Sequence, residues 1–129
     1  MRHSVANDAV DELSRAVIGA AIEVHRLLGP GFAEAVYEEA FCVELSLRGI
    51  AFARQPAIKI GYKGHVVGEG RLDLLVGNEL IVELKAVDAL APVHTAQLLS
   101  YLRATDRKLG LLINFNVRLL KQGIVRLVL

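Results

Sequence analysis

The stretch Gly68–Lys85, GEGRLDLLVGNELIVELK, combines two short strand patterns with charged side chains at regular spacing. Successive residues of a strand project to opposite faces of a sheet. Arg71 and Asp73 therefore share one face of the first segment, and Glu83 and Lys85 share one face of the second. The opposite face is apolar in both segments and carries Leu72, Leu74, Val76, Leu80, Val82 and Leu84. This pattern predicts a hairpin with one core-facing side and one polar side.

The turn Gly77-Asn78-Glu79 decides whether the two acids meet. A two-residue turn would place Asp73 opposite an apolar residue on the core face, which is unfavourable. A three-residue turn needs a left-handed position, which glycine and asparagine adopt readily, and it places Asp73 opposite Glu83 and Arg71 opposite Lys85. Opposed residues have Cβ atoms about 4.5–5.5 Å apart. Carboxylates at that distance repel unless a proton or a cation lies between them, so this register predicts a divalent metal site.

Length and composition limit the class of protein. With 129 residues, we expect a single domain over residues 1–129 that buries about two-thirds of its unfolded surface. Hydrophobic residues make up 53% of the chain, yet no apolar run approaches the ~18–20 residues that a membrane helix needs, so we exclude a membrane protein. The apolar excess favours a buried sheet or a subunit interface, and we expect a homo-oligomer such as a homodimer.

The lone cysteine and the charge balance bear on location and partners. Cys42 cannot form an internal disulfide, and residues 1–10 lack the apolar core of a signal peptide. Both features predict a cytoplasmic protein. The net charge of +1 gives no support for a strongly basic surface that attracts nucleic acid without specificity. Any nucleic-acid role therefore depends on local features.

Two helices are predicted before the first strand. Apolar residues from Val10 to Leu27 recur at alternating steps of three and four, which is typical of an amphipathic helix. Gly29-Pro30-Gly31 ends it, because proline cannot continue a helix and glycine accepts a left-handed cap. A second helix is expected over residues 33–48. Its apolar stripe would consist of Val36, Ala40, Val43 and Leu47, and another face would carry Glu34, Tyr37, Glu38 and Phe41.

An extended region and a helix–strand unit complete the expected fold. Residues 51–85 are predicted to form three antiparallel strands, with a turn at Lys63-Gly64. Pro92 suits the first turn of a helix. Residues 108–115 should then form a strand parallel to the last of the three, because strand–helix–strand crossovers normally join parallel strands. Residues 124–128 form a final strand. The fold class is therefore α/β, an α+β arrangement with a mixed sheet, in the order helix, helix, three strands, helix, two strands.

The order of the elements and one spacing of charged residues match a known group of enzymes. Asp73, Glu83 and Lys85 form the pattern D-x9-E-x-K across two neighbouring strands. In this respect the chain resembles the PD-(D/E)xK nuclease superfamily. The resemblance implies a restriction-endonuclease-like core.

More closely, the chain is similar to the small proteins named for a G-x-x-E-x-x-Y motif. Gly31, Glu34 and Tyr37 supply that motif in LGPGFAEAVYEEAF. The segments GEGRLDLLV, IVELKAV and LGLLINFN, together with the Q-x-x-x-Y pair Gln97 and Tyr101, extend the resemblance over nearly the whole chain.

This resemblance implies metal-assisted hydrolysis of phosphodiester bonds in DNA or RNA. Asp73 and Glu83 would hold Mg²⁺, or Mn²⁺, because a hard cation prefers carboxylate oxygens and keeps several waters, and the backbone carbonyl of Leu84 would complete the site. The metal would polarise the scissile phosphate and lower the pKa of a bound water. Lys85 would orient that water or neutralise charge that develops on the phosphate.

Two helices would add side chains to the same site. Glu34 matches an acid on the first core helix of related nucleases, where it contacts a metal-bound water or a second metal. Gln97 and Tyr101 match a helical pair whose side chains back the active site and approach the substrate backbone.

Each of these residues also has a purely structural interpretation. Asp73 and Glu83 could lie on the solvated face of a sheet. Glu38 and Glu39 fall in the first turns of a helix, where the macrodipole favours acids, and we interpret them in that way. Tyr37 could be a core aromatic whose hydroxyl bonds inward.

The candidate residues of the later helix and the histidines also have structural interpretations. Gln97 and Tyr101 could be an ordinary surface pair. His94 lies one turn before Gln97 on the same face and could reach the site, whereas we interpret His25 as structural.

The chain departs from the superfamily pattern in ways that leave its activity open. Leu72 stands where proline often precedes the first acid, and the chain is small and nearly neutral. The alternative to an enzyme is therefore a catalytically silent nuclease fold that binds nucleic acid or serves as a dimeric assembly module. The basic residues available to hold a substrate are Arg54, Lys59, Lys63, Arg71, Lys85, Arg103, Arg107 and Lys108.

Overall fold

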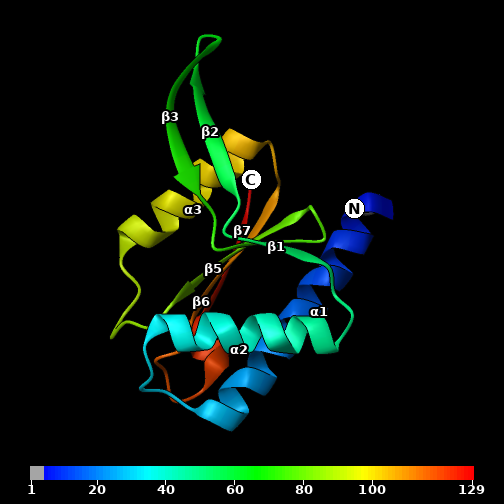
Figure 1. The fold of residues 1–129 in the computed structure, drawn as a ribbon, viewed down its shortest axis with the longest axis vertical. Helices are drawn as coiled ribbons and strands as arrows, with labels where there is room; N and C mark the ends of the chain where they lie inside the picture. Colours follow the sequence, from blue (N-terminus) through cyan, green and yellow to red (C-terminus); the bar gives the residue numbers. More distant parts are fainter. Residues whose placement is uncertain (1–4) are drawn as a thin grey trace.

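The computed structural model describes residues 5–129, and Figure 1 shows a twisted sheet with helices around it and one hairpin that stands away from the body. Residues 1–4, on which part of the signal-peptide prediction depends, lie outside the described residues. The elements in chain order are α1 (Val5–Leu28), α2 (Glu34–Leu47), β1 (Phe52–Arg54), β2 (Ala57–Tyr62), β3 (His65–Arg71), β4 (Leu74–Val76), β5 (Leu80–Lys85), α3 (Pro92–Thr105), β6 (Leu109–Asn114), the 3-10 helix η1 (Leu120–Gly123) and β7 (Ile124–Val128).

The main sheet has the strand order β1-β4-β5-β6-β7 and is mixed. β5 and β6 pair in parallel, as predicted for the crossover through α3, and the other neighbouring pairs are antiparallel. Every residue of β6 is buried, and so is every residue of β5 except Lys85. Fully buried strands are expected where helices cover both faces of a sheet. The predicted α/β class with a mixed sheet is confirmed.

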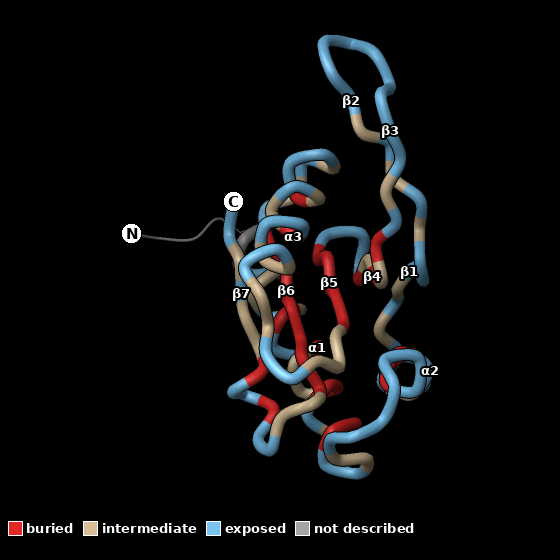
Figure 2. Tube along the Cα trace, turned by 90° about the vertical axis from the view of Figure 1, so that its left-hand side faces the viewer, coloured by how far each residue is buried: buried red, intermediate tan, exposed pale blue. Residues whose placement is uncertain are grey.

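The helices divide the core into two layers, one on each face of the sheet. α1 and α2 pack on one face, where their buried residues, such as Val17 and Phe41, join Leu80, Val82 and Leu84 of β5. On the other face, α3 packs Leu98 and Leu102 against Ile81, Leu112 and Leu72. Figure 2 shows β5 and β6 as the most deeply buried strands, between these layers.

The predicted register of the central hairpin is confirmed. Leu74 pairs with Val82 and Val76 with Leu80, so the loop between β4 and β5 has three residues. Gly77 and Asn78 adopt left-handed backbone angles there, with φ of 58° and 59°. By the same count Asp73 lies opposite Glu83, one position beyond the last paired residue.

The prediction of three strands over residues 51–85 is wrong in its detail, because the chain forms five. Gln55 adopts a left-handed φ of 53° and Pro56 has no N–H to donate, so the chain leaves the sheet after β1. β2 and β3 then form a separate two-stranded sheet. Consequently Arg71 pairs with Ala57 rather than with Lys85. The bend that follows also moves Leu72 from the predicted apolar face to the α3 side.

The apolar stripe predicted for α2 is also wrong. Val36, Val43 and Leu47 are exposed, and the residues that enter the core are Tyr37, Glu38, Phe41, Cys42 and Leu45. Two faces of this helix carry apolar residues, and the face with the aromatic rings is buried because large rings remove the most apolar surface from water.

None of the helices within the described residues has the length and apolar character required to cross a bilayer.

Candidate functional site

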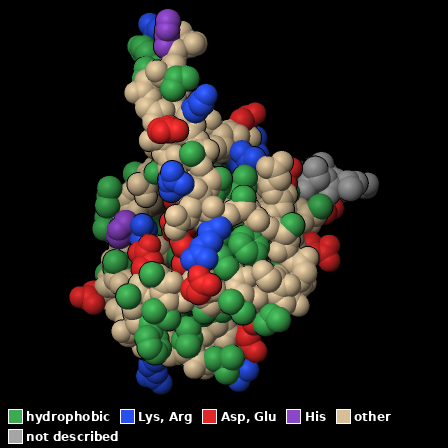
Figure 3. Space-filling view, in the orientation of Figure 1, with side chains coloured by type: hydrophobic (Ala, Val, Ile, Leu, Met, Phe, Trp, Pro, Cys, Tyr) green, Lys and Arg blue, Asp and Glu red, His purple; other side chains and the backbone are tan. Residues whose placement is uncertain are grey.

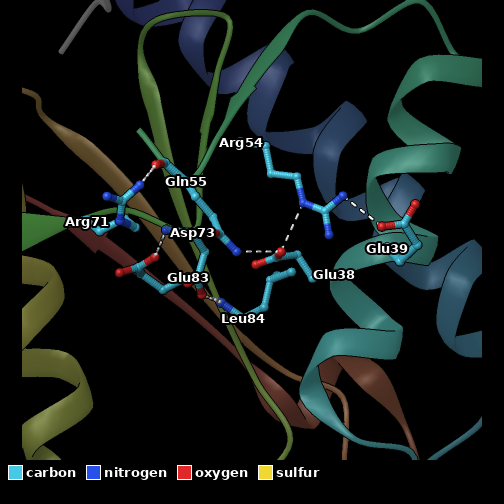
Figure 4. Close-up of polar contacts among 8 residues, drawn as sticks. All are labelled: Glu38, Glu39, Arg54, Gln55, Arg71, Asp73, Glu83 and Leu84. Carbon is cyan, nitrogen blue, oxygen red and sulfur yellow. Dashed lines mark hydrogen bonds and ion pairs between the residues drawn. The ribbon is translucent and has the colours of Figure 1, made fainter. Parts of the chain in front are cut away.

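Asp73 and Glu83 are held by hydrogen bonds that cross between their segments. The backbone N–H of Leu84 donates to Oδ2 of Asp73 at 2.7 Å, and the backbone N–H of Asp73 donates to Oε2 of Glu83 at 2.7 Å. Figure 4 shows the two side chains at the end of the hairpin, where β4 has given way to a bend. These bonds restrict both side chains and keep the carboxyl groups near each other.

Burial raises the pKa of both carboxyl groups. For Glu83, burial and then the negative charge of Asp73 raise the pKa to about 8. For Asp73, burial raises the pKa more than the Leu84 N–H and the Lys85 ammonium lower it. A carboxylate pair of this kind favours a bound proton or a bound cation. Near neutral pH, and without a cation, the raised pKa values favour a proton bound by the pair.

The backbone of Lys85 is fixed at the end of β5. Its carbonyl accepts the N–H of Phe115 at 2.9 Å. The loop that follows is held by the buried Asn114, whose Oδ1 accepts the N–H of Val87 at 3.0 Å and whose Nδ2 donates to the Val87 carbonyl at 2.9 Å. We did not predict the role of Asn114. The only signal in the sequence is a polar residue inside the apolar run LGLLINF.

Glu34 begins α2 and belongs to the same electrostatic neighbourhood. Partial burial raises the pKa of its carboxyl group, the positive charge of Lys85 lowers it, and the negative charges of Asp73 and Glu38 raise it further. A smaller lowering comes from His94. The structure therefore brings Glu34, Asp73 and Lys85 close enough for their charges to interact.

The loop before α2 depends on Gly31 and Tyr37. Gly31 has a φ of 110°, which L-residues rarely adopt. The fully buried Tyr37 donates its hydroxyl proton to the Gly29 carbonyl at 2.5 Å and accepts the N–H of Phe32 at 3.2 Å. Its ring stacks on Phe115, with centroids 4.7 Å apart. Tyr37 is therefore a core residue that fixes the loop from which Glu34 enters the site.

Glu38 corrects our interpretation of the acids on α2. It is buried and accepts hydrogen bonds from Nε of Arg54 at 3.0 Å and from Nε2 of Gln55 at 2.9 Å. Its charge raises the pKa of Asp73, so it is part of the site's electrostatics. Glu39 does lie at the surface, in an ion pair with Arg54. The face shared by Glu38 with Tyr37 was the signal in the sequence that could have identified it.

Gln55 joins this network to the carboxylate pair. Its side chain bonds Glu38, its backbone N–H donates to the Asp73 carbonyl at 2.8 Å, and its own carbonyl accepts Nη1 of Arg71 at 2.8 Å. Figure 4 shows this chain of contacts between α2 and the hairpin. A non-glycine residue with a positive φ often marks a position that the surroundings enforce. Nothing in our sequence analysis singled out Gln55.

The candidate residues on α3 are not joined to the carboxylate pair by the hydrogen bonds described above. Gln97 is exposed, and within residues 5–129 no hydrogen bond joins it to the carboxylates. Tyr101 packs against Gly70, with Cε1 3.0 Å from the position that a Cβ on that glycine would take. His94 accepts the N–H of Ala91 at 3.0 Å and so caps the helix.

His25 is structural, as we interpreted it. It is buried, and its Nε2 contacts the Val117 carbonyl at 2.7 Å.

The chemistry of the donor set limits the metal that the site could hold. Among the described residues, no group of three or more His, Cys, Asp or Glu side chains could hold an ion. Two carboxylates alone do not make a zinc site, which usually has three or four protein ligands. They do suit Mg²⁺, which usually binds one or two carboxylates and keeps several waters.

Comparison with known proteins agrees with this geometry. The profile of the PD-(D/E)XK nuclease superfamily matches residues 11–127, which is most of the chain. No curated protein sequence matches this chain. The fold is consistent with this match, because two helices cover one face of the sheet, one helix covers the other, and two acids and a lysine lie around the central hairpin. The chain belongs to the PD-(D/E)XK nuclease superfamily.

Proposed function

We propose that this protein hydrolyses phosphodiester bonds of nucleic acid with the help of Mg²⁺ or Mn²⁺. The observation that carries the proposal is the pair Asp73 and Glu83, a half-buried and a buried carboxyl group with raised pKa values, each of which accepts a hydrogen bond from a backbone N–H group of the other segment. Holding two like charges together is unfavourable unless a cation compensates them. A site for a divalent cation explains why the fold keeps this pair.

The strand geometry supports the carbonyl of Leu84 as a third ligand. The N–H and C=O of one strand residue point to the same side. The Leu84 N–H reaches Asp73, whereas the carbonyl of the next residue, Lys85, bonds to Phe115 on the β6 side. The Leu84 carbonyl therefore faces the side on which Asp73 lies.

When bound, the metal would polarise the scissile phosphate and supply a water of lowered pKa. The protein's own residues would do the rest. The Lys85 ammonium would orient the attacking water and offset negative charge that develops on the phosphate. Glu34, whose pKa is affected by the charges of Lys85 and Asp73, would accept a hydrogen bond from a metal-bound water. Tyr101 and Gln97 would approach the substrate backbone.

A cleavage assay tests this proposal. Purified protein is incubated with labelled DNA and RNA in millimolar Mg²⁺ or Mn²⁺, and chain scission is followed on denaturing gels. We expect metal-dependent cleavage by the wild type and a loss of at least 100-fold for Asp73→Asn and for Lys85→Ala. That loss corresponds to about 2.7 kcal/mol of transition-state stabilisation.

Matched controls show whether the effect is local. Glu79→Gln removes an exposed carboxylate from the turn of the same hairpin, and Lys121→Ala removes an exposed lysine elsewhere. Both should cleave like the wild type. Equal activity in the wild type, Asp73→Asn and Lys85→Ala would refute the site. Metal-independent binding of nucleic acid without cleavage would instead favour the silent binding module.

Three finer points stay proposals. Membership of the G-x-x-E-x-x-Y group is supported by the roles of Gly31 and Tyr37 in placing Glu34. A homodimer is supported by the exposed apolar side chains on α2, and light scattering of the purified protein would test it. A cytoplasmic location is supported by the lone free thiol of Cys42.

A further inference from the structure

The hairpin formed by β2 and β3, residues 57–71, is here called the arm, and it projects from the body (Figure 1). It forms a two-stranded sheet of its own. All of its residues are exposed except Ile58, Ile60 and Gly70, which are half-buried. A lone hairpin is only marginally stable in water, and this one packs against the body near its root, through residues such as Ile58 and Gly70.

The root of the arm is attached to the carboxylate pair. β3 ends at Arg71, two residues before Asp73. The N–H of Leu72 donates to the Pro56 carbonyl at 3.1 Å, and the arginine bonds the carbonyl of Gln55, whose own N–H bonds Asp73. Through these contacts the direction of the arm is fixed relative to the site.

The arm is more basic than the rest of the chain. It carries Lys59, Lys63 and Arg71 against the single acid Glu69, a net charge of +2 with His65 neutral, whereas the whole chain has +1. Figure 3 shows lysine and histidine side chains at and near the tip, on the part that extends furthest into solvent. This local charge favours an anionic partner, although the chain as a whole is nearly neutral.

Two glycines of the arm, Gly61 and Gly68, flank the register shift between β2 and β3. A Cβ on Gly61 or on Gly68 would meet nothing nearer than 3.9 Å, and neither residue has a left-handed φ. The other glycines of the arm do have a local reason: Gly64 has a φ of 80° in the turn, and Gly70 touches Tyr101. Glycine weakens a strand, but it permits another backbone or a ligand to approach closely. Gly68 pairs with Ile60 and Gly61 pairs with Val66, so each glycine leaves one position of the arm without side-chain cover.

We propose that the arm lies in the groove of double-stranded DNA next to the phosphodiester bond at the site, an inference that rests on the proposed nuclease function. A two-stranded ribbon fits the B-form major groove, which is about 12 Å wide, whereas the major groove of A-form RNA is too narrow and deep for side chains to read. Single strands are usually held on stacked aromatic rings, and the arm carries only Tyr62.

The length of the arm sets its reach. The seven residues of β3 are joined by six steps of about 3.3 Å and so extend about 20 Å, which corresponds to about six base pairs at about 3.4 Å each when the arm follows the DNA axis. The tip would therefore contact DNA about six base pairs from the bond that is cut.

Binding is measured in the Asp73→Asn background so that the DNA stays intact. Fluorescence anisotropy is recorded with a labelled 24-base-pair DNA duplex, the matching single strand and an RNA duplex, at several salt concentrations. We expect Lys59→Ala with Lys63→Ala to weaken duplex binding at least tenfold and to reduce the log–log salt slope by about 2, one unit for each lost phosphate contact. The matched pair Arg15→Ala with Lys121→Ala, two exposed cations outside the arm, should bind within twofold of the parent.

Gly68→Val tests the close approach separately from charge. A valine has room there and suits a strand, so the melting temperature of the variant should equal or exceed that of the parent while duplex binding falls at least fivefold.

The inference is overturned if the arm variants bind like the matched pair, if single strands or RNA bind as tightly as duplex DNA, or if the variants turn a dimer into a monomer in light scattering.

The cleavage assay separates this inference from the proposed function. Wild-type cleavage together with arm variants that bind normally would contradict the arm alone. Arm-dependent duplex binding without metal-dependent cleavage by the wild type would contradict the nuclease function alone.

Discussion

At the scale of single residues, the site depends on two carboxyl groups that the fold holds close together. Asp73 and Glu83 face each other because a three-residue turn sets their register, and this much followed from alternation and turn chemistry. Glu38 and Gln55 could not be predicted in the same way. Their roles depend on a left-handed backbone at Gln55 and on which face of α2 is buried, and both are decided by contacts between distant segments.

The raised pKa of Glu83 predicts how stability depends on pH. An unfolded glutamate has a pKa near 4.5, and the folded Glu83 has a pKa of about 8. Between these values the folded state binds more protons than the unfolded state, so the free energy of unfolding falls as pH rises from about 4.5 to about 8. Glu83→Gln should flatten this dependence in thermal melts recorded from pH 5 to pH 9, whereas Glu79→Gln should keep it. A Glu83→Gln protein with the unchanged wild-type slope would contradict the assignment.

The same linkage predicts the effect of metal. On our proposal Mg²⁺ would bind the deprotonated pair and compete with the proton, so 10 mM Mg²⁺ should raise the melting temperature more at pH 8.5 than at pH 5.5. Removing the ion with EDTA should reverse the increase, and Asp73→Asn should abolish it. A shift that is the same at both pH values, or that survives in Asp73→Asn, would mean that the ion binds elsewhere.

Tyr37 allows a test of the loop that places Glu34. Tyr37→Phe removes a hydroxyl that bonds the Gly29 carbonyl and the Phe32 N–H, and such a loss costs about 1–3 kcal/mol. We expect a corresponding loss in chemical denaturation, together with lower cleavage activity. Tyr62→Phe, an exposed tyrosine of the arm, is the matched control and should leave the free energy of unfolding unchanged. Equal stability of the two variants would show that the Tyr37 hydroxyl does not stabilise the loop.

At the scale of elements, the sequence predicted which segments are helical or extended better than it predicted which faces they bury. β6 was expected from an apolar run, and β7 was expected as a final strand over residues 124–128. α2 carries two apolar faces, and periodicity alone cannot choose between them. The break at Gln55-Pro56 was also missed, because a proline at an edge strand is compatible with a continuous strand.

The burial of α2 gives a prediction for that element. Leu45→Ala removes a fully buried side chain and should cost about 2–5 kcal/mol. Leu47→Ala, two residues further along the same helix and 76% exposed, should stay within about 0.5 kcal/mol of the wild type. Urea denaturation of both variants measures the difference. Equal losses would contradict this assignment of the buried face of α2.

At the scale of the whole molecule, two core layers enclose the central strands β5 and β6, and the carboxylate pair lies on β5 and in the bend just before β4. Both layers share these strands, so loosening either one would disturb the site. We therefore propose that residues 1–129 act as one domain. Calorimetry and circular dichroism should report one coincident transition, and two separated transitions would contradict this.

The central claim is that Asp73 and Glu83 form a metal site. Crystals grown or soaked in Mn²⁺ and measured near the manganese absorption edge would test it most directly, because the anomalous signal locates the ion without assumptions about activity. We predict one strong peak within bonding distance of both carboxylates and of the Leu84 carbonyl, and its loss in Asp73→Asn. A difference map without a peak between Asp73 and Glu83 at millimolar Mn²⁺ and pH 8.5 would contradict the claim.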